Sequence, residues 1–168
     1  MQIDTANDDD LPAIVAIYNH YIEHSFATFD TKPFTVTDRV AWFAAFDRPI
    51  RQCLVARRDG AVVGYACSTA FKPKPAWDST AEVSVYVGPR QTGSGVGAAL
   101  YSKLLPRLDA AGLHRAAAVI ALPNEPSIAL HERFGFEAMG TISEGGYKFG
   151  AYHDVAYLIR HAADARPR

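Results

Sequence analysis

The chain has 168 residues, of which 49% are hydrophobic and 21% charged, and this composition predicts a single domain over residues 1–168, with an ordered core over about 1–160 and a tail over 161–168. Its formal net charge is -1 and it has no cluster of Lys or Arg, which argues against a nucleic-acid or membrane partner. No apolar run approaches the roughly 20 residues that cross a bilayer, and the acidic start "MQIDTANDDD" is unlike a targeting peptide, so we expect a cytoplasmic protein.

The first third of the chain predicts two helices. Asn7 and the three aspartates after it precede an apolar stripe at helical spacing, and Pro12 suits a first helical turn. The stripe consists of Leu11, Ile14, Val15, Tyr18, Tyr21 and Ile22. A second helix is expected over residues 36–46, with Thr35 or Thr37 near its start.

Three strands are expected next. Residues 53–70 predict a hairpin that turns at Asp59–Gly60, because this dipeptide favours the turns that join antiparallel strands. Residues 71–79 contain prolines and predict an exposed loop, and residues 80–88 are rich in strand formers. Cys53 and Cys67 lie in the hairpin strands and are expected to be small core residues; without a Cys-x-x-Cys pair we expect no metal site.

The second half begins with a glycine-rich stretch and alternates helices and strands. We expect a helix over residues 96–112, kinked at Pro106 and ended by Gly112, then a strand over 114–122. A helix over 124–136 and two strands around a glycine-rich turn over 136–160 follow. The order of elements predicts an α/β fold, a mixed sheet with helices on its faces.

The stretch "VGPRQTGSGVGAAL" predicts a backbone loop between a strand and a helix N-terminus, a suitable place for a phosphate group. A P-loop would need Gly-Lys-Ser/Thr, whereas Gly97 is followed by Ala98 and Ala99. A dinucleotide-binding motif would lie in the first βαβ unit, whereas this loop follows a hairpin past mid-chain. From the loop alone, a tight turn with glycines for packing remains an alternative.

Longer segments carry a resemblance to a known family. "SVYVGPRQTGSGVGAALYSKLL" resembles the acetyl-CoA motif of the GNAT acetyltransferase superfamily, and "NEPSIALHERFGF" resembles its following helix. Together with "AIYNHYIEHSFATFDTKPFT", "WDSTAEVSVYV" and "KFGAYHDVAYL", they resemble phosphinothricin acetyltransferases and related N-acyltransferases that act on methionine sulfoximine or methionine sulfone. The resemblance implies a mixed, mostly antiparallel sheet of about six to seven strands flanked by about four helices. It also implies acetyl transfer from acetyl-CoA to a small amine in a ternary complex, by a homodimer without a metal.

Acetyl transfer to an amine needs a base, because such an amine is mostly protonated at neutral pH. Glu82 stands among strand formers, and strand alternation places it on one face with Ser84 and Tyr86. The resemblance implies that Glu82 is the base; a solvent-facing strand carboxylate is the alternative. His131 is implied as a second catalytic residue that protonates the thiolate or relays the proton, and a core histidine is the alternative.

The resemblance also implies that acetyl-CoA binds along the strand, the loop and two helix starts. The implied residues are Val85, Tyr86, Val87, Gly93, Ser94, Gly95, Val96, Gly97, Ala98, Asn124 and Arg133. Asn124 would alternatively only cap its helix, and Arg133 would alternatively be a solvated surface residue. Thr92 departs from the family, which usually has Gln or Arg there, so we expect backbone amides to do most of the binding.

For the acceptor amine, the resemblance implies Phe29 as a pocket aromatic and Lys72, Lys74 and Trp77 as a substrate loop. The two lysines could hold an anionic group or simply be solvated. His153 is implied only at the pocket or at the dimer contact. Two alternatives to a small-molecule enzyme remain: an acyl-CoA-binding sensor or scaffold without catalysis, and an enzyme that acetylates a protein N-terminus or an antibiotic amine.

Overall fold

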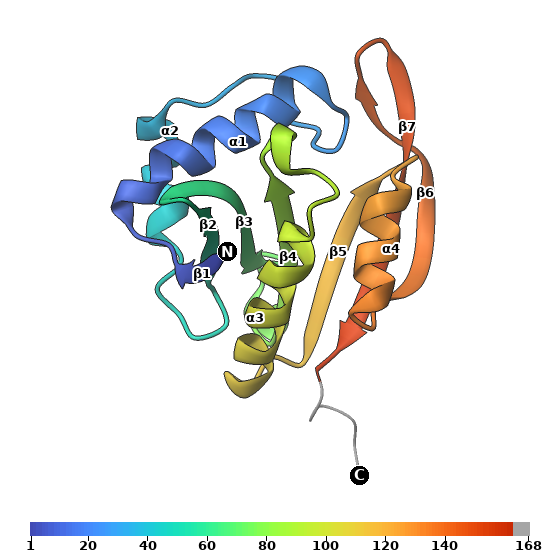
Figure 1. Cartoon of the computed structure of the whole chain (residues 1–168). Helices are drawn as coiled ribbons and strands as arrows, with labels where there is room; N and C mark the ends of the chain where they lie inside the picture. The colour runs from blue at the N-terminus through green and yellow to red at the C-terminus, as the bar shows by residue number, and fades with distance from the viewer. Residues whose placement is uncertain (163–168) are drawn as a thin grey trace.

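A computed structural model describes residues 1–162 and contains one seven-stranded sheet with helices on both faces (Figure 1). The strands are β1 (Gln2–Thr5), β2 (Cys53–Arg58), β3 (Ala61–Ala70), β4 (Thr80–Val87), β5 (Arg115–Ala121), β6 (Glu137–Lys148) and β7 (Ala151–His161). Their order in the sheet is β1-β2-β3-β4-β5-β7-β6. Within residues 1–162, β4 and β5 are the only strands that pair in parallel, which confirms the predicted mixed, mostly antiparallel sheet.

Four α-helices cover the sheet in the described part of the chain: α1 (Leu11–His24), α2 (Val36–Ala44), α3 (Val96–Ala110) and α4 (Glu125–Arg133). Strand alternation sends neighbouring side chains to opposite faces. Leu54 and Ala66 therefore pack with the core of α3, whereas Val55 and Tyr65 pack with α1 and the aromatic residues of α2. Helices α1 and α2 thus cover one face, and α3 and α4 the other. None of the helices among residues 1–162 has the length and apolar character needed to span a membrane.

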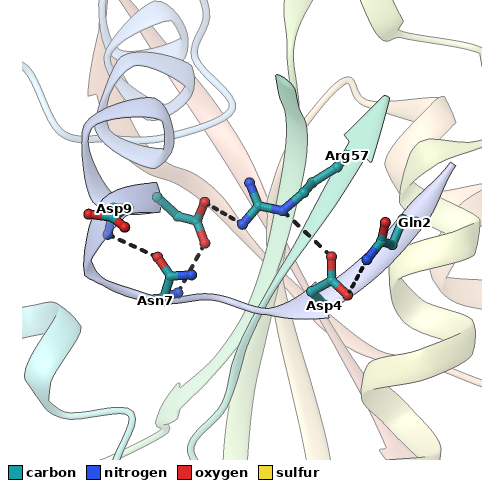
Figure 2. A network of polar contacts seen from close by, with 6 residues as sticks. Gln2, Asp4, Asn7, Asp9 and Arg57 are labelled. Carbon is teal, nitrogen blue, oxygen red and sulfur yellow. Dashed lines mark hydrogen bonds and ion pairs between the residues drawn. The ribbon is translucent and has the colours of Figure 1, made fainter. Parts of the chain in front are cut away.

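The N-terminal strand β1 was not predicted from the sequence, because its four residues carry no strong strand pattern. It pairs with β2, and polar contacts fix it there (Figure 2). Arg57 of β2 forms an ion pair with Asp4 of β1, drawn in Figure 2, and the two charged groups lie 3.5 Å apart. The same guanidinium lies 2.6 Å from the buried carboxylate of Asp10. Asn7 caps the turn before α1 by accepting from the amide of Asp9 at 2.9 Å.

Most local signals in the sequence are confirmed by the backbone. Asp59 and Gly60 both have positive φ, 51° and 80°, as a two-residue hairpin turn requires. Thr35 caps α2 in a capping box, although this helix ends at Ala44 rather than at residue 46.

Three predicted details differ. Helix α3 includes Pro106, as expected, but ends at Ala110 rather than at Gly112, and the kink at Pro106 stays a prediction. The turn between the last two strands lies at Phe149–Gly150, while Gly145 and Gly146 belong to β6. Strand β7 includes His161, which was expected in the tail; residues 163–168 lie outside the described part.

Candidate active site

The central feature of the site is the divergence of β4 from β5. The two strands pair with each other from Thr80↔Arg115 to Glu82↔Ala117. Beyond this point β4 continues to Val87 and β5 to Ala121, but they no longer pair with each other (Figure 1). A first cavity of about 340 Å³ lies between them. The second half of β4 remains bonded to β3 on its other side. Its opposite edge therefore offers backbone groups to this cavity. One of them is already engaged, because the Val87 carbonyl accepts from the Tyr21 hydroxyl at 2.7 Å.

The glycine-rich loop forms one wall of the first cavity and leads into α3. Gly93 and Gly95 have φ of +73° and +81°, a conformation that favours glycine. Gly95 is the N-cap of α3, and no side chain caps this helix start. The first amides of α3, from Val96 to Ala98, therefore lack partners within the helix, and the helix dipole adds positive potential there. The expected loop and helix start are present, and phosphate binding there stays a prediction.

The predicted cofactor residues divide into two groups. Those that line the first cavity are Val85, Tyr86, Val87, Gly93, Gly95, Gly97, Ala98 and Asn124, together with Thr92. Ser94, Val96 and Arg133 do not line it. The amide and hydroxyl of Ser94 both donate to the carbonyl of Gln91, at 3.2 and 2.6 Å, the Val96 side chain is buried, and Arg133 is exposed on α4.

Two polar side chains of this wall are already engaged within the fold. The Thr92 hydroxyl donates to the carbonyl of Pro89 at 3.4 Å, a long bond that a better acceptor can replace. Asn124 Oδ1 accepts from the amide of Ser127 at 3.3 Å and so caps α4. Asn124 therefore acts as a helix cap and also lines the cavity.

His131 lies on α4 at the inner end of the first cavity and is 3% exposed. Its Nδ1 is 2.7 Å from the carbonyl of Ser127 and must donate to it, so in the neutral ring Nε2 accepts from the Tyr101 hydroxyl at 2.9 Å. Burial lowers the pKa of His131, which favours this neutral form. Both nitrogens have partners, as the core-histidine interpretation expects, and the proposed catalytic role stays a prediction.

A second cavity, of about 280 Å³, lies on the other face of β4 and contains Glu82. Its lining also includes Tyr18, Thr28, Phe29, Arg39, Trp42, Tyr65, Cys67, Thr69, Ser84 and Tyr86. The alternation predicted for β4 is thereby confirmed: Glu82, Ser84 and Tyr86 face this cavity, while Val83, Val85 and Val87 pack on the α3 side. The two cavities share Ala27, Ser84, Tyr86 and Val119 in their walls, so they meet beside β4.

The Glu82 side chain is half-buried, and its carboxylate forms no hydrogen bond or ion pair with any other residue in the range 1–162. Burial raises its pKa above the usual glutamate value, and the charge of Lys72 partly opposes this rise. A carboxylate with a raised pKa accepts a proton more readily than an exposed one, so its chemistry suits a general base.

The segment after α1 carries Thr28 and Phe29 and forms one wall of the second cavity. The Tyr18 hydroxyl lies 2.7 Å from Thr28 Oγ1 and donates to Asp30 Oδ2 at 2.6 Å; burial and this carboxylate raise the pKa of Tyr18 to about 12. Lys148 of β6 reaches under the same segment and donates to the carbonyls of Ser25 and Thr28 at 2.8 and 2.7 Å. A lysine remote in sequence thus holds this wall in place.

The predicted substrate loop lines neither cavity, although the charge of Lys72 acts on Glu82. Lys72, Lys74 and Trp77 are exposed and line neither cavity; the Lys72 ammonium lies 4.9 Å from the ring centre of Phe71. Of the predicted acceptor residues, only Phe29 lines the second cavity. Sequence reasoning missed Arg39 and Trp42, which α2 places in the cavity wall. Their i, i+3 spacing puts them on one helix face, but nothing local marks that face as part of a site.

His153 lies at the start of β7 and stacks on Phe26, with ring centres 4.3 Å apart. It lines a separate groove together with residues of α4 and Tyr152. His153 does not line the second cavity, but its ring centre lies 6.4 Å from that of Phe29, which does. Its expected role at the pocket or the dimer contact stays a prediction. Among residues 1–162, no group of three or more His, Cys, Asp and Glu side chains could hold a metal ion.

The chain is similar to known proteins over nearly its whole length. A family model described as "Acetyltransferase (GNAT) family" matches residues 14–136. The chain is 42% identical to a phosphinothricin N-acetyltransferase of Streptomyces coelicolor, over 95% of each chain. It is 39% identical to an L-methionine sulfoximine/L-methionine sulfone acetyltransferase of Pseudomonas aeruginosa, over 89% of this chain and 87% of that one. A solved GNAT superfamily phosphinothricin acetyltransferase from Sinorhizobium meliloti, in complex with AcCoA, superposes with a TM-score of 0.93 at 32% identity, over 99% of this chain and 92% of that one.

Proposed function

The chain belongs to the GNAT acetyltransferase family, and we propose that it acetylates the primary amine of a small amino-acid-like acceptor by direct attack in a ternary complex with acetyl-CoA. Phosphinothricin, methionine sulfoximine and methionine sulfone are the acceptor types that its relatives' names suggest. The observation that carries the proposal is the meeting of the two cavities at Ser84 and Tyr86. One cavity has an uncapped helix start for a phosphate group, and the other has a free carboxylate for an amine.

The first cavity fits the co-substrate, which supplies an activated acetyl group on a thioester. The amides of Gly97 and Ala98 at the start of α3 would hold its pyrophosphate, since a helix N-terminus binds anions. Gly97 is also a packing requirement, because a Cβ there would lie 3.1 Å from Leu130 Cδ2. The edge of β4 from Val85 to Val87, which does not pair with β5, would bind the amide-bearing arm, and Tyr21 already donates to the Val87 carbonyl there.

In the second cavity, Glu82 would take the proton of the ammonium group, directly or through water, and so expose the nitrogen lone pair. Because Ser84 and Tyr86 line both cavities, an amine in the second would face an acetyl group in the first across β4. The neutral His131 donates Nδ1–H to the Ser127 carbonyl and accepts from the Tyr101 hydroxyl, so it would hold Ser127 and Tyr101 in place. A catalytic role for His131 would require its ring to give up one of these two hydrogen bonds.

A free-CoA release assay tests the proposal. Acetyl-CoA would be combined with phosphinothricin, methionine sulfoximine, methionine sulfone, the common L-amino acids, an N-terminal alanyl peptide and an aminoglycoside. The expected result is thiol release with at least one of the first three acceptors, and N-acetyl product by mass spectrometry. Thermal stabilisation by acetyl-CoA with no thiol release across the panel would instead support a sensor or scaffold, and release only with the peptide or the aminoglycoside would reassign the acceptor.

We further propose a homodimer formed through the β6–β7 hairpin, which projects from the sheet in Figure 1. β6 is an edge strand, and edge strands invite pairing. The exposed apolar and aromatic side chains of this hairpin are Met139, Ile142, Tyr147, Phe149 and Tyr152. Light scattering of the intact protein checks the state, and a monomer at all concentrations used in the assay would reject the dimer.

A further inference from the structure

We propose that Arg39 binds an oxyanion of the acceptor, a carboxylate or a chemically similar acidic group, and so selects acidic amines for the reaction at Glu82. The proposal rests on the proposed function and adds a specificity-determining residue to it. Arg39 belongs to α2, outside every segment from which the sequence predicted a role in acceptor binding.

The charges of the second cavity point to this role. Arg39 and Glu82 are the only members of its lining with side chains charged at neutral pH. Its other ionisable groups remain neutral: burial raises the pKa of Tyr65 and Tyr86 well above the usual value and that of Cys67 to about 12. One fixed cation and one carboxylate in a small cavity complement an amino acid, whose ammonium would face the carboxylate and whose acidic group would face the guanidinium.

The environment of Arg39 leaves its hydrogen-bonding edge free. The guanidinium carbon lies 3.9 Å from the ring centre of Trp42, 4.9 Å from that of Phe34 and 5.2 Å from that of Tyr18. Stacking of this kind engages the face of the guanidinium and leaves its N–H groups in the plane. The side chain is half-buried, and no hydrogen bond or ion pair joins it to another residue within 1–162.

Chemistry favours an oxyanion as the missing partner. Arg stays charged at any ordinary pH and has five donors, and a planar carboxylate accepts two of them in parallel. A half-buried guanidinium without such a partner loses hydrogen bonds to water and gains none from the protein. A bound acidic group would replace them by accepting two of its N–H groups. The exposed lysines Lys72 and Lys74 line neither cavity and therefore do not compete for this place in the described structure.

Steady-state kinetics of Arg39→Met and Arg39→Lys test the proposal with three acceptors. Methionine sulfone has one acidic group, its α-carboxylate; its α-carboxamide has none; phosphinothricin has a carboxylate and a phosphinate. We expect Arg39→Met to raise KM for phosphinothricin and methionine sulfone about ten- to a hundredfold, since the variant loses hydrogen bonds between charged groups, which are stronger than those between neutral groups. The carboxamide should be used equally by wild type and variant. Arg39→Lys keeps the charge but not the planar guanidinium, so its KM for the acidic acceptors should lie between those of wild type and Arg39→Met.

The pattern identifies the source of the oxyanion. If KM rises for both acidic acceptors, Arg39 binds the α-carboxylate. If KM rises for phosphinothricin alone, Arg39 binds the phosphinate of its side chain. An equal KM change for the carboxamide, or unchanged KM for both acidic acceptors, would overturn the proposal. Should Arg39→Met fail to fold, the same comparison with Arg39→Lys decides.

Controls separate this inference from the proposed function. Arg48→Met removes an equivalent charge from an exposed loop residue and should leave all three KM values unchanged. Acetyl-CoA should still raise the melting temperature of Arg39→Met, because Arg39 does not line the first cavity. If wild type acetylates none of the amino-acid-like acceptors, the proposed function fails; if it acetylates them and Arg39→Met does so with unchanged KM, only this inference fails.

Discussion

Replacement of Lys148 by Met should destabilise the protein and loosen the acceptor wall. Lys148 is 4% exposed, and its ammonium donates to the carbonyls of Thr28 at 2.7 Å, Ser25 at 2.8 Å and Tyr21 at 3.4 Å. Methionine keeps most of the aliphatic stem but offers no donor. The carbonyls of Ser25 and Thr28 would then lose a charged partner at the end of α1.

The size of the effect follows from these bonds. Hydrogen bonds to charged groups contribute about 1.5–3 kcal/mol each, and two of the three are short. The variant no longer buries an ammonium group, and this gain offsets part of the loss. We expect the free energy of unfolding to fall by about 3 kcal/mol, which for a protein of this length lowers Tm by roughly 6–12 °C.

Thermal melts followed by circular dichroism measure the change, with Lys103→Met as the matched control. Lys103 is exposed on α3 and its side chain forms no hydrogen bond or ion pair with residues 1–162, so its replacement should change Tm little. Because Thr28 and Phe29 line the second cavity, KM for the amine should rise more than KM for acetyl-CoA in Lys148→Met. A Tm within 2 °C of wild type, in the same buffer as the control, would refute the reasoning from these three bonds.

Three further predictions concern the second cavity. Glu82→Gln should lower kcat/KM at least about a hundredfold, and wild-type kcat/KM should fall as pH decreases through the raised pKa of Glu82, because only the ionised carboxylate can accept a proton; near-wild-type turnover of the variant at low amine concentration would exclude this base. Gly146→Ala should raise KM for the amine, because its Cβ would lie 2.7 Å from Cδ1 of Phe29 and displace that ring from the cavity wall, whereas an unchanged KM would show that the ring moves freely. Cys67 should resist iodoacetamide in the native protein at pH 8 and react after denaturation, because burial raises its pKa to about 12; rapid native labelling by mass spectrometry would contradict this.

Much of the fold was determined locally and could be predicted from the sequence. The turn at Asp59–Gly60, the cap at Thr35 and the alternation of β4 depend on a few neighbouring residues, and all three are confirmed. The uncapped start of α3 after Gly95 follows from the same kind of signal. By contrast, β1 consists of four residues whose strand conformation depends on pairing with β2, a partner remote in sequence.

The site itself was decided largely by tertiary structure. The sequence places Glu82 on a strand face, but the parallel pairing that ends at Glu82↔Ala117 opens the first cavity, and no local signal predicts where two strands part. Arg39 enters the second cavity because α2 packs beside α1 on the face of the sheet that Glu82 shares. Local propensity and periodicity fix the elements because they act over a few residues. Which side chains meet in a cavity depends on how those elements pack, since packing alone brings distant residues together.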